Sequence, residues 1–286
     1  MMILIDFSQI AYACTIEYLL MTKQKNADIA LVRHMMLNTI RVNVKKYKND
    51  YGEVVIAYDS DTYWRKEKFP HYKANRKKSR ENSQFNWQSI FTCIDALRKE
   101  FRQYLPYKVI EVSGAEADDI IGCLTYEQVL GTQVLILSGD KDFFQLQSAN
   151  ANVTQRSPFV KGDLKDNVSP DVILKDHIIR GDTGDGIPNI LSPDDVFVSG
   201  GRQKPLHTKK LVEWLTKTPE EFCVDGDMLK NYKRNEELID LRRIPSHIKE
   251  SILQAYAEAT PASRSEFLKY LVASGLKELT SSVSDF

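Results

Sequence analysis

Short apolar runs alternate with long helix-patterned segments in the first half of the chain. Four runs have the length of buried parallel strands, at residues 2–5, 54–58, 109–112 and 134–137. The intervening segments with helical spacing cover residues 27–48, 88–104 and 115–130. This alternation predicts an α/β fold, in which a mostly parallel central sheet carries helices on both faces.

The second half of the chain has a different pattern. After about residue 165 the apolar runs stop and helical periodicity continues, interrupted by Pro170, Pro188, Pro193, Pro205, Pro219, Pro245 and Pro261. A chain of 286 residues with 42% hydrophobic and 27% charged residues can bury a substantial core. We therefore expect an α/β core at 1–165 followed by a smaller helical region at 166–286.

The formal net charge is zero, but the charge is unevenly distributed. Residues 63–80 hold eight Lys or Arg residues against the single Glu67, a net charge of +7. Aromatic side chains are interleaved with these cations, including Trp64 and Tyr72. Such a charge run is usually a solvated surface, but beside a phosphodiesterase centre its cations and rings favour binding to the phosphates and unpaired bases of single-stranded nucleic acid.

The four cysteines are scattered and show no CxxC or Cys/His spacing, which disfavours a disulfide scaffold and a zinc site. The chain opens with MMILID, without the basic start and cleavage site of a signal peptide, and no apolar run is long enough to span a membrane. We expect a cytoplasmic protein without membrane association. The five histidines show no ligand pattern, and we assign them no chemistry.

Acidic residues follow the predicted strands, where a parallel sheet gathers its functional groups. Asp6, Asp59 and the pair Asp140 and Asp142 follow three of the strands. A further group, Glu116, Asp118 and Asp119, opens a helix on which Glu116 and Asp119 share one face. The last pair, Asp182 and Asp185, lies in the Gly-rich segment RGDTGDGIPN.

So many carboxylates cannot share a small site unless cations neutralise them. Oxygen ligands without Cys or His suit Mg²⁺ or Mn²⁺, and two such ions roughly 4 Å apart stabilise the attacking and leaving oxygens of a phosphodiester displacement. Each acid alone could instead be a turn former, a helix cap or a partner of a helix dipole. Five separate explanations are less economical than one shared metal site.

Several segments in this order resemble the 5′-nuclease (flap endonuclease) superfamily, and within it the phage ribonuclease H branch. The segments are LIDFSQIA at 4–11, VRHMMLNTI at 32–40, YWR at 63–65, YKANR at 72–76, GAEADD at 114–119, LILSGDKDFFQL at 135–146, RGDTGD at 180–185 and GLKELTSSVSDF at 275–286. The resemblance runs nearly from end to end. It implies a PIN-like 5′-nuclease core and a helical C-terminal region that binds duplex.

The resemblance also implies roles for single residues. One metal ion would be held by Asp6, Asp59, Asp140 and either Glu116 or Asp119, and a second would lie near Asp142, Asp182 and Asp185. Asp118 matches a position that is acidic in many relatives. Residues 60–87 match a helical arch around the 5′ strand, in which Lys73, Arg65 and Arg76 would contact the scissile phosphate and Tyr72, Lys77, Lys78 and Arg80 would bind nucleic acid.

One departure from the family concerns the grip on the duplex. Cellular relatives carry a Gly-Ile-Gly hairpin after the second acidic motif, whereas here Asp185 is followed by GIPNILSPDDVFVSGGRQKPLHTKK. The pair Gly200–Gly201 and the basic residues Arg202, Lys204, Lys209 and Lys210 are candidates for a different grip.

The carboxylates predict a Mg²⁺-dependent nuclease, and the resemblance implies a 5′→3′ exonuclease and flap endonuclease acting on RNA primers and DNA flaps in phage replication. The expected partners are DNA and RNA·DNA duplexes with 5′ single-stranded ends, a single-strand-binding protein and a sliding clamp, with the enzyme as a monomer. Alternatives are a non-catalytic nucleic-acid-binding replication protein, a PIN-type ribonuclease and a phosphatase of the haloacid-dehalogenase type. That phosphatase chemistry needs a second Asp where this chain has Ser8.

Overall fold

The computed structural model describes residues 1–149, 151–164 and 168–286. Its centre is a sheet of five parallel strands in the order β3-β2-β1-β4-β5. The strands are β1 (Met2–Asp6), β2 (Glu53–Ala57), β3 (Lys108–Ile110), β4 (Gln133–Leu137) and β5 (Asn152–Arg156). The four predicted strands are confirmed to within two residues at each end. The edge strand β5 was missed because its sequence NVTQR has a single large apolar residue.

The central strand β1 is buried along its whole length, because strands flank it and helices cover both faces. One face packs against α1 (Phe7–Thr22), α2 (Ile29–Tyr51) and α5 (Trp87–Tyr104) in a large apolar core. Helix α1 begins directly after β1, where the carboxylate of Asp6 accepts a hydrogen bond from Gln9 N at 3.1 Å. The helix cap and the end of the strand are therefore the same residue.

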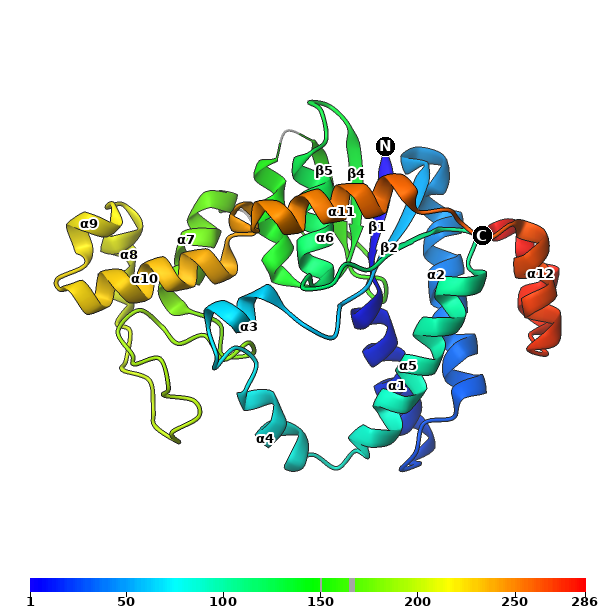
Figure 1. Cartoon of the computed structure of the whole chain (residues 1–286), viewed down its shortest axis with the longest axis horizontal. Helices are drawn as coiled ribbons and strands as arrows, with labels where there is room; N and C mark the ends of the chain where they lie inside the picture. Colours follow the sequence, from blue (N-terminus) through cyan, green and yellow to red (C-terminus); the bar gives the residue numbers. More distant parts are fainter. Residues whose placement is uncertain (150, 165–167) are drawn as a thin grey trace.

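The opposite face packs against α6 (Ala117–Tyr126), the 3₁₀ segment η1 (Lys141–Ser148) and α11 (Ser246–Glu258). In Figure 1 α11 runs across the front of the sheet, above α6. Helices therefore lie on both faces, as the sequence predicted. Because α11 belongs to the C-terminal half, the two halves of the chain share this core through Ile248, Ile252 and Leu241, which lies in the short η2 (Leu241–Arg243).

A helical lobe extends from one end of the sheet (Figure 1). It contains α7 (Pro170–Arg180), α8 (Thr208–Leu215), α9 (Pro219–Phe222) and α10 (Gly226–Ile239), around an apolar core of their own. Phe69 and Tyr72, from the basic segment, are buried in this core. Residues 168–286 contain no strand, in agreement with the predicted change to helix.

The chain ends in α12 (Arg264–Ala273), α13 (Lys277–Ser281) and η3 (Val283–Asp285), which return to the α1–α2–α5 side of the sheet. Phe267 and Phe286 are buried there with their rings 4.7 Å apart. Asp285 pairs with Arg41 at 2.6 Å and Lys45 at 3.1 Å on α2. The acidic end of the chain is thus packed against the core.

The basic segment bridges the helical lobe and α5 along the lower side of the view in Figure 1. It contains the short helices α3 (Trp64–Lys68) and α4 (Asn75–Glu81) and ends where α5 begins. We call residues 60–87 the arch. No residue of α4 is buried, whereas the first part of the arch buries Trp64, Phe69 and Tyr72.

Candidate metal centre

Three neighbouring strands bring acidic side chains to one edge of the sheet. Asp6 closes β1, Asp59 follows β2, and Asp140 follows β4. Hydrogen bonds fix two of these carboxylates: Ser138 Oγ donates to Asp6 at 3.1 Å, and Ser8 Oγ donates to Asp59 at 2.5 Å. Asp59 also accepts from the backbone N of Ala117 at 2.8 Å, which brings the start of α6 and its acidic residues to this edge.

Burial and mutual repulsion dominate the environment of two carboxylates at this edge. Burial and the neighbouring Asp59 raise the pKa of Asp6 to about 7. Burial, followed by the charges of Asp140, Asp6 and Glu116, raises the pKa of Asp118 well above its ordinary value. Within the described ranges no donor is hydrogen-bonded to the side chain of Asp118. Buried oxygen ligands that repel one another in this way favour the binding of a divalent cation.

Asp119 has the opposite environment, although it is the next residue in the chain. Its carboxylate is completely buried and accepts bonds from Arg65 Nη1 at 2.9 Å and Trp64 Nε1 at 3.1 Å. Arg65 is also buried and donates from Nε to the carbonyl of Leu238 at 2.8 Å and from Nη1 to Glu116 at 2.9 Å. The metal role of Asp119 and the phosphate contact of Arg65 remain predictions, and this placement does not favour them.

Glu116 links the start of α6 to the arch. It is buried and accepts hydrogen bonds from Arg65, from Tyr72 Oη at 2.9 Å and from Lys73 Nζ. Burial would lower the pKa of Lys73, but Glu116 and Asp185 outweigh it, and the net effect raises this pKa. Lys73 is therefore a cation held beside the acidic edge. Tyr72, expected to bind nucleic acid, is buried in this contact.

A second acidic group contains a histidine. His177, in the last turn of α7, lies between Asp142 and Asp182, with Nδ1 and Nε2 each 3.3 Å from a carboxylate oxygen. One ligand atom from each residue lies within 4.8 Å of the others, the spacing of a metal site. The expectation that the histidines have no chemistry needs correction here. No local signal marked His177, because Asp142 comes from a distant segment.

This histidine also sets the charge of the second group. Burial would lower the pKa of His177, but Asp182 and Asp142 raise it to about 9. Burial raises the pKa of Asp142 to about 7 despite the attraction of His177. Burial would raise the pKa of Asp182, but the hydrogen bond between Asp182 and His177 outweighs burial, and the net effect lowers this pKa. The protonated imidazole offsets one of the two carboxylate charges.

Asp185 contacts the arch and is not part of the group around His177. Its side chain accepts from Tyr72 Oη at 2.8 Å and pairs with Arg76, and Lys73 Nζ lies 3.7 Å away. The backbone N of Lys73 donates to the carbonyl of Asp185 at 2.7 Å. The loop itself requires Gly181, whose φ is +67° and where a Cβ would lie 2.3 Å from the carbonyl oxygen of Ile187. This loop therefore anchors the base of the arch.

Comparison with known protein families decides the class of the chain. Residues 1–174 match the 5′-3′ exonuclease N-terminal resolvase-like domain. The chain belongs to the 5′-3′ exonuclease family. Residues 168–286 match the C-terminal domain described for T4 RNase H.

Individual proteins similar to this 5′-3′ exonuclease family member are nucleases as well. Ribonuclease H of Enterobacteria phage T4 is 32% identical over 99% of this chain and 95% of the relative. A 5′-3′ exonuclease of Buchnera aphidicola is 30% identical over 54% of each chain. The D15 flap endonuclease of bacteriophage T5, solved with DNA and metal ions, has the same fold, with a TM-score of 0.58, 15% identity, and coverage of 90% of this chain and 99% of that one.

In this exonuclease-family chain, the remaining basic candidates lie on the surface. Lys77 and Lys78 are exposed on α4, and Arg80 lies over the ring of Trp87. The proposed duplex grip, consisting of Arg202, Lys204, Lys209 and Lys210, is exposed at the end of the α7–α8 connection and the start of α8. The described part of that connection contains turns and no helix. Among the described residues, no helix has the length and apolar character needed to cross a membrane.

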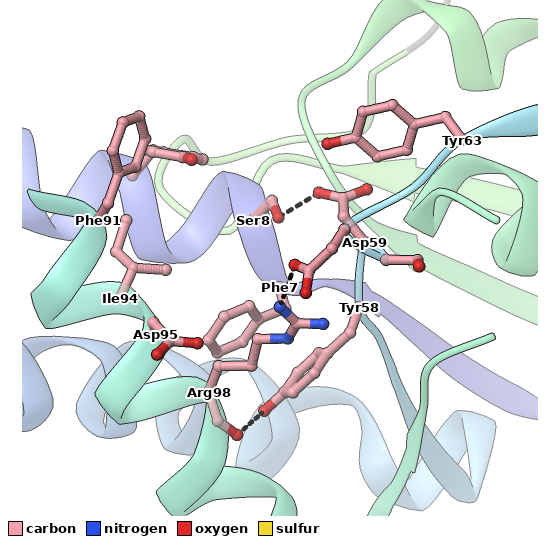
Figure 2. Close-up of a pocket in the computed structure, with 12 residues that line it drawn as sticks. Phe7, Ser8, Tyr58, Asp59, Tyr63, Phe91, Ile94, Asp95 and Arg98 are labelled. Carbon is pink, nitrogen blue, oxygen red and sulfur yellow. Dashed lines mark hydrogen bonds and ion pairs between the residues drawn. The ribbon is translucent and has the colours of Figure 1, made fainter. Parts of the chain in front are cut away.

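A cavity of about 320 Å³ adjoins the acidic edge on the side of α5. Figure 2 shows Phe91, Ile94 and Arg98 of α5 facing Ser8 and Asp59 across it. The cavity thus combines an acidic wall with an aromatic wall beside the candidate metal ligands.

Proposed function

We propose that this protein is a Mg²⁺-dependent 5′→3′ exonuclease and flap endonuclease that hydrolyses RNA primers and DNA flaps during phage replication. The observation that carries the proposal is the buried, mutually repelling carboxylate edge of Asp6, Asp59, Asp118 and Asp140, next to the cations of the arch. Similarity to the T4 ribonuclease H over nearly the whole chain supports the same activity.

We assign two cation positions. The first comprises Asp6, Asp59, Asp118 and Asp140, with Asp118 in place of Asp119 because only Asp118 faces the other acids. The second comprises Asp142, Asp182 and His177. Two Mg²⁺ or Mn²⁺ ions there would stabilise the attacking and leaving oxygens of the phosphodiester. The two carboxylates at the second position suit Mg²⁺ or Mn²⁺.

The chain's own side chains orient this centre. Ser138 and the backbone N of Gln9 hold Asp6, and Ser8 holds Asp59, so the ligands are fixed before a cation binds. Lys73 is held at the acidic edge by Glu116, where its ammonium can bind a non-bridging oxygen of the scissile phosphate.

Arg76 has a similar place at the base of the arch. It pairs with Asp185, and its side chain is less buried than that of Lys73. A phosphate that enters the arch can compete with Asp185 for this guanidinium, which would bind and orient the 5′ strand.

Cleavage of a 5′-labelled flap DNA and of an RNA·DNA hybrid with Mg²⁺ tests the proposal. We expect cleavage by the wild type and by the control Asp227→Asn, an exposed acid of α10, and none by the double variant Asp140→Asn, Asp142→Asn. Absence of wild-type cleavage, or full activity of the double variant, contradicts it. Binding without cleavage by the wild type would support a non-catalytic replication protein instead.

The partners follow from this activity. We propose duplexes with 5′ single-stranded ends as substrates, a monomeric enzyme in the host cytoplasm, and contacts with a single-strand-binding protein and a sliding clamp at the replication fork.

A further inference from the structure

Arg80 lies over two aromatic rings at the end of α4. Its Cζ atom is 5.4 Å from the ring centre of Trp87 and 4.8 Å from that of Phe91. No carboxylate pairs with Arg80 in the ranges that the structure describes, whereas its neighbour on the helix, Arg76, pairs with Asp185. The guanidinium is held by the rings alone, so its charge remains available to an anion.

Trp87 packs against the edge of the sheet's apolar core and Phe91 lies outside it, whereas neighbouring residues of α5 are buried in that core. Helix α5 directs Ile90 and Leu97 into the core of the sheet, where both are fully buried. Trp87 and Phe91 are one helical turn apart and only partly buried, with ring centres 5.8 Å apart. Phe91 belongs to none of the three apolar clusters of the described chain. Trp87 is oriented by a hydrogen bond from Nε1 to Ser83 Oγ at 2.5 Å.

Two cavities share Tyr12 in their lining, and between them they reach these rings and the acidic edge. The cavity of about 320 Å³ includes Asp59, Tyr12 and Phe91 in its lining. A second cavity, of about 280 Å³, is lined by Tyr12, Arg76, Ser79, Arg80 and Trp87. Figure 2 shows Phe91 on the far side of the first cavity from Asp59. A strand that places a phosphate at Asp59 therefore has an aromatic path leading to Arg80.

We propose that Trp87 and Phe91 form a stacking site for an unpaired base of the 5′ strand, while Arg80 moves from the ring faces to the adjoining phosphate. This inference rests on the proposed function, which brings a 5′ strand to Asp59. A flat aromatic face beside an unpaired cation is complementary to a nucleotide, which joins a ring to an anion.

The surrounding charge supports the same occupant. Lys77 and Lys78 are exposed on α4, so a strand that leaves the stacking site meets further cations. Because every base has a π face, we expect the site to accept any base.

A binding experiment with two substrates separates stacking from general attraction. Affinity is measured in EDTA, which prevents turnover, for a 5′-flap DNA and for the same DNA with abasic residues in the flap. We expect Phe91→Leu and Trp87→Leu each to weaken binding of the intact flap on the order of tenfold, the loss of one base–aromatic stack. On the abasic flap, which has no base to stack, each variant should bind with the same affinity as the wild type. The control Phe159→Leu changes an exposed ring in the β5–α7 connection, outside the arch, and should alter neither affinity.

An equal loss on both flaps, or no loss on either, overturns the stacking site. Phe91→Leu keeps an apolar side chain outside the cores, so its thermal unfolding should match the wild type. Tryptophan fluorescence gives a second readout, because Trp64 and Trp214 are buried and Trp87 is not. Flap binding should quench the emission in the wild type and in Trp214→Phe but not in Trp87→Phe, and quenching that persists in Trp87→Phe contradicts the proposal.

The proposed function fails separately. A wild-type protein that cuts no flap in Mg²⁺ overturns the nuclease, and the affinities measured in EDTA still decide the stacking site. A protein that cuts flaps while both ring variants bind like the wild type retains the nuclease and loses the stacking site.

Discussion

Asp118 and Asp119 are adjacent, and the structure predicts opposite consequences when each is replaced by Asn. Asp119 is fully buried and accepts from Arg65, Trp64 and the backbone N of Glu116 at 3.0 Å. Asn at this position removes the charge that compensates a buried guanidinium. Breaking a buried ion pair in this way costs about 3–5 kcal/mol. Because Glu116 still pairs with Arg65, we expect the lower end, about 3 kcal/mol.

In thermal unfolding this loss is readily measured. At roughly 2–4 °C per kcal/mol for a chain of this size class, Asp119→Asn should lower the Tm by about 10 °C. Asp118→Asn instead removes a charge from a crowded acidic edge, so without metal the Tm should stay the same or rise. Its turnover should fall more than about a hundredfold, since loss of a mere outer-shell partner already costs about 10–100-fold.

The assay is thermal unfolding followed by circular dichroism in EDTA and in Mg²⁺, together with flap cleavage. Asp119→Asn should keep part of its activity below its Tm and should still be stabilised by Mg²⁺, whereas Asp118→Asn should lose that stabilisation. A stable, inactive Asp119→Asn with an unstable, active Asp118→Asn would refute the assignment of the two acids.

Three further results are expected. The double variant Lys73→Met, Arg76→Gln removes two cations of the arch and with them charge-assisted phosphate contacts, so flap cleavage in single-turnover kinetics should slow at least about tenfold. An unchanged rate would show that neither cation reaches the phosphate. The pKa values of about 7 for Asp6 and Asp142 and about 9 for His177 lie above the values of these groups in the unfolded chain. Between about pH 4 and 9 the folded protein therefore retains protons that the unfolded chain releases, and the free energy of unfolding of the metal-free protein falls as the pH rises. Mg²⁺ replaces those protons, so its increase in Tm should be larger at pH 8 than at pH 6, and an equal or smaller increase at pH 8 would contradict these shifts. Flap affinity in EDTA should fall linearly with the logarithm of salt concentration, by about 0.7–0.9 log units for each phosphate contact, and a flat response would exclude an electrostatic grip.

The sequence predicts the sheet well because its central strands are continuous apolar runs. The edge strand β5 escapes this signal, since only one of its faces contacts a core and its side chains are mostly polar. Helix α1 was not predicted either. It follows β1 without a turn, and Asp6 both ends the strand and caps the helix, so no turn residues mark the start of a new element.

In the candidate site, local sequence predicts the spacing of the acids but not their contacts with distant segments. Helical spacing places Glu116 and Asp119 on one face, and the structure confirms that both contact the same guanidinium. That face is directed to Arg65, whose position comes from a distant segment and leaves no mark in the local sequence. For the same reason, the spacing of the chain did not reveal His177 between Asp142 and Asp182.

A crystal of the protein soaked in Mn²⁺ and measured at the manganese absorption edge tests the central claim most directly. We expect one anomalous peak among Asp6, Asp59, Asp118 and Asp140, and a second between Asp142 and Asp182. A peak coordinated by Asp119, or an acidic edge without any peak at saturating Mn²⁺, would contradict the assignment of this edge as the metal centre of the nuclease.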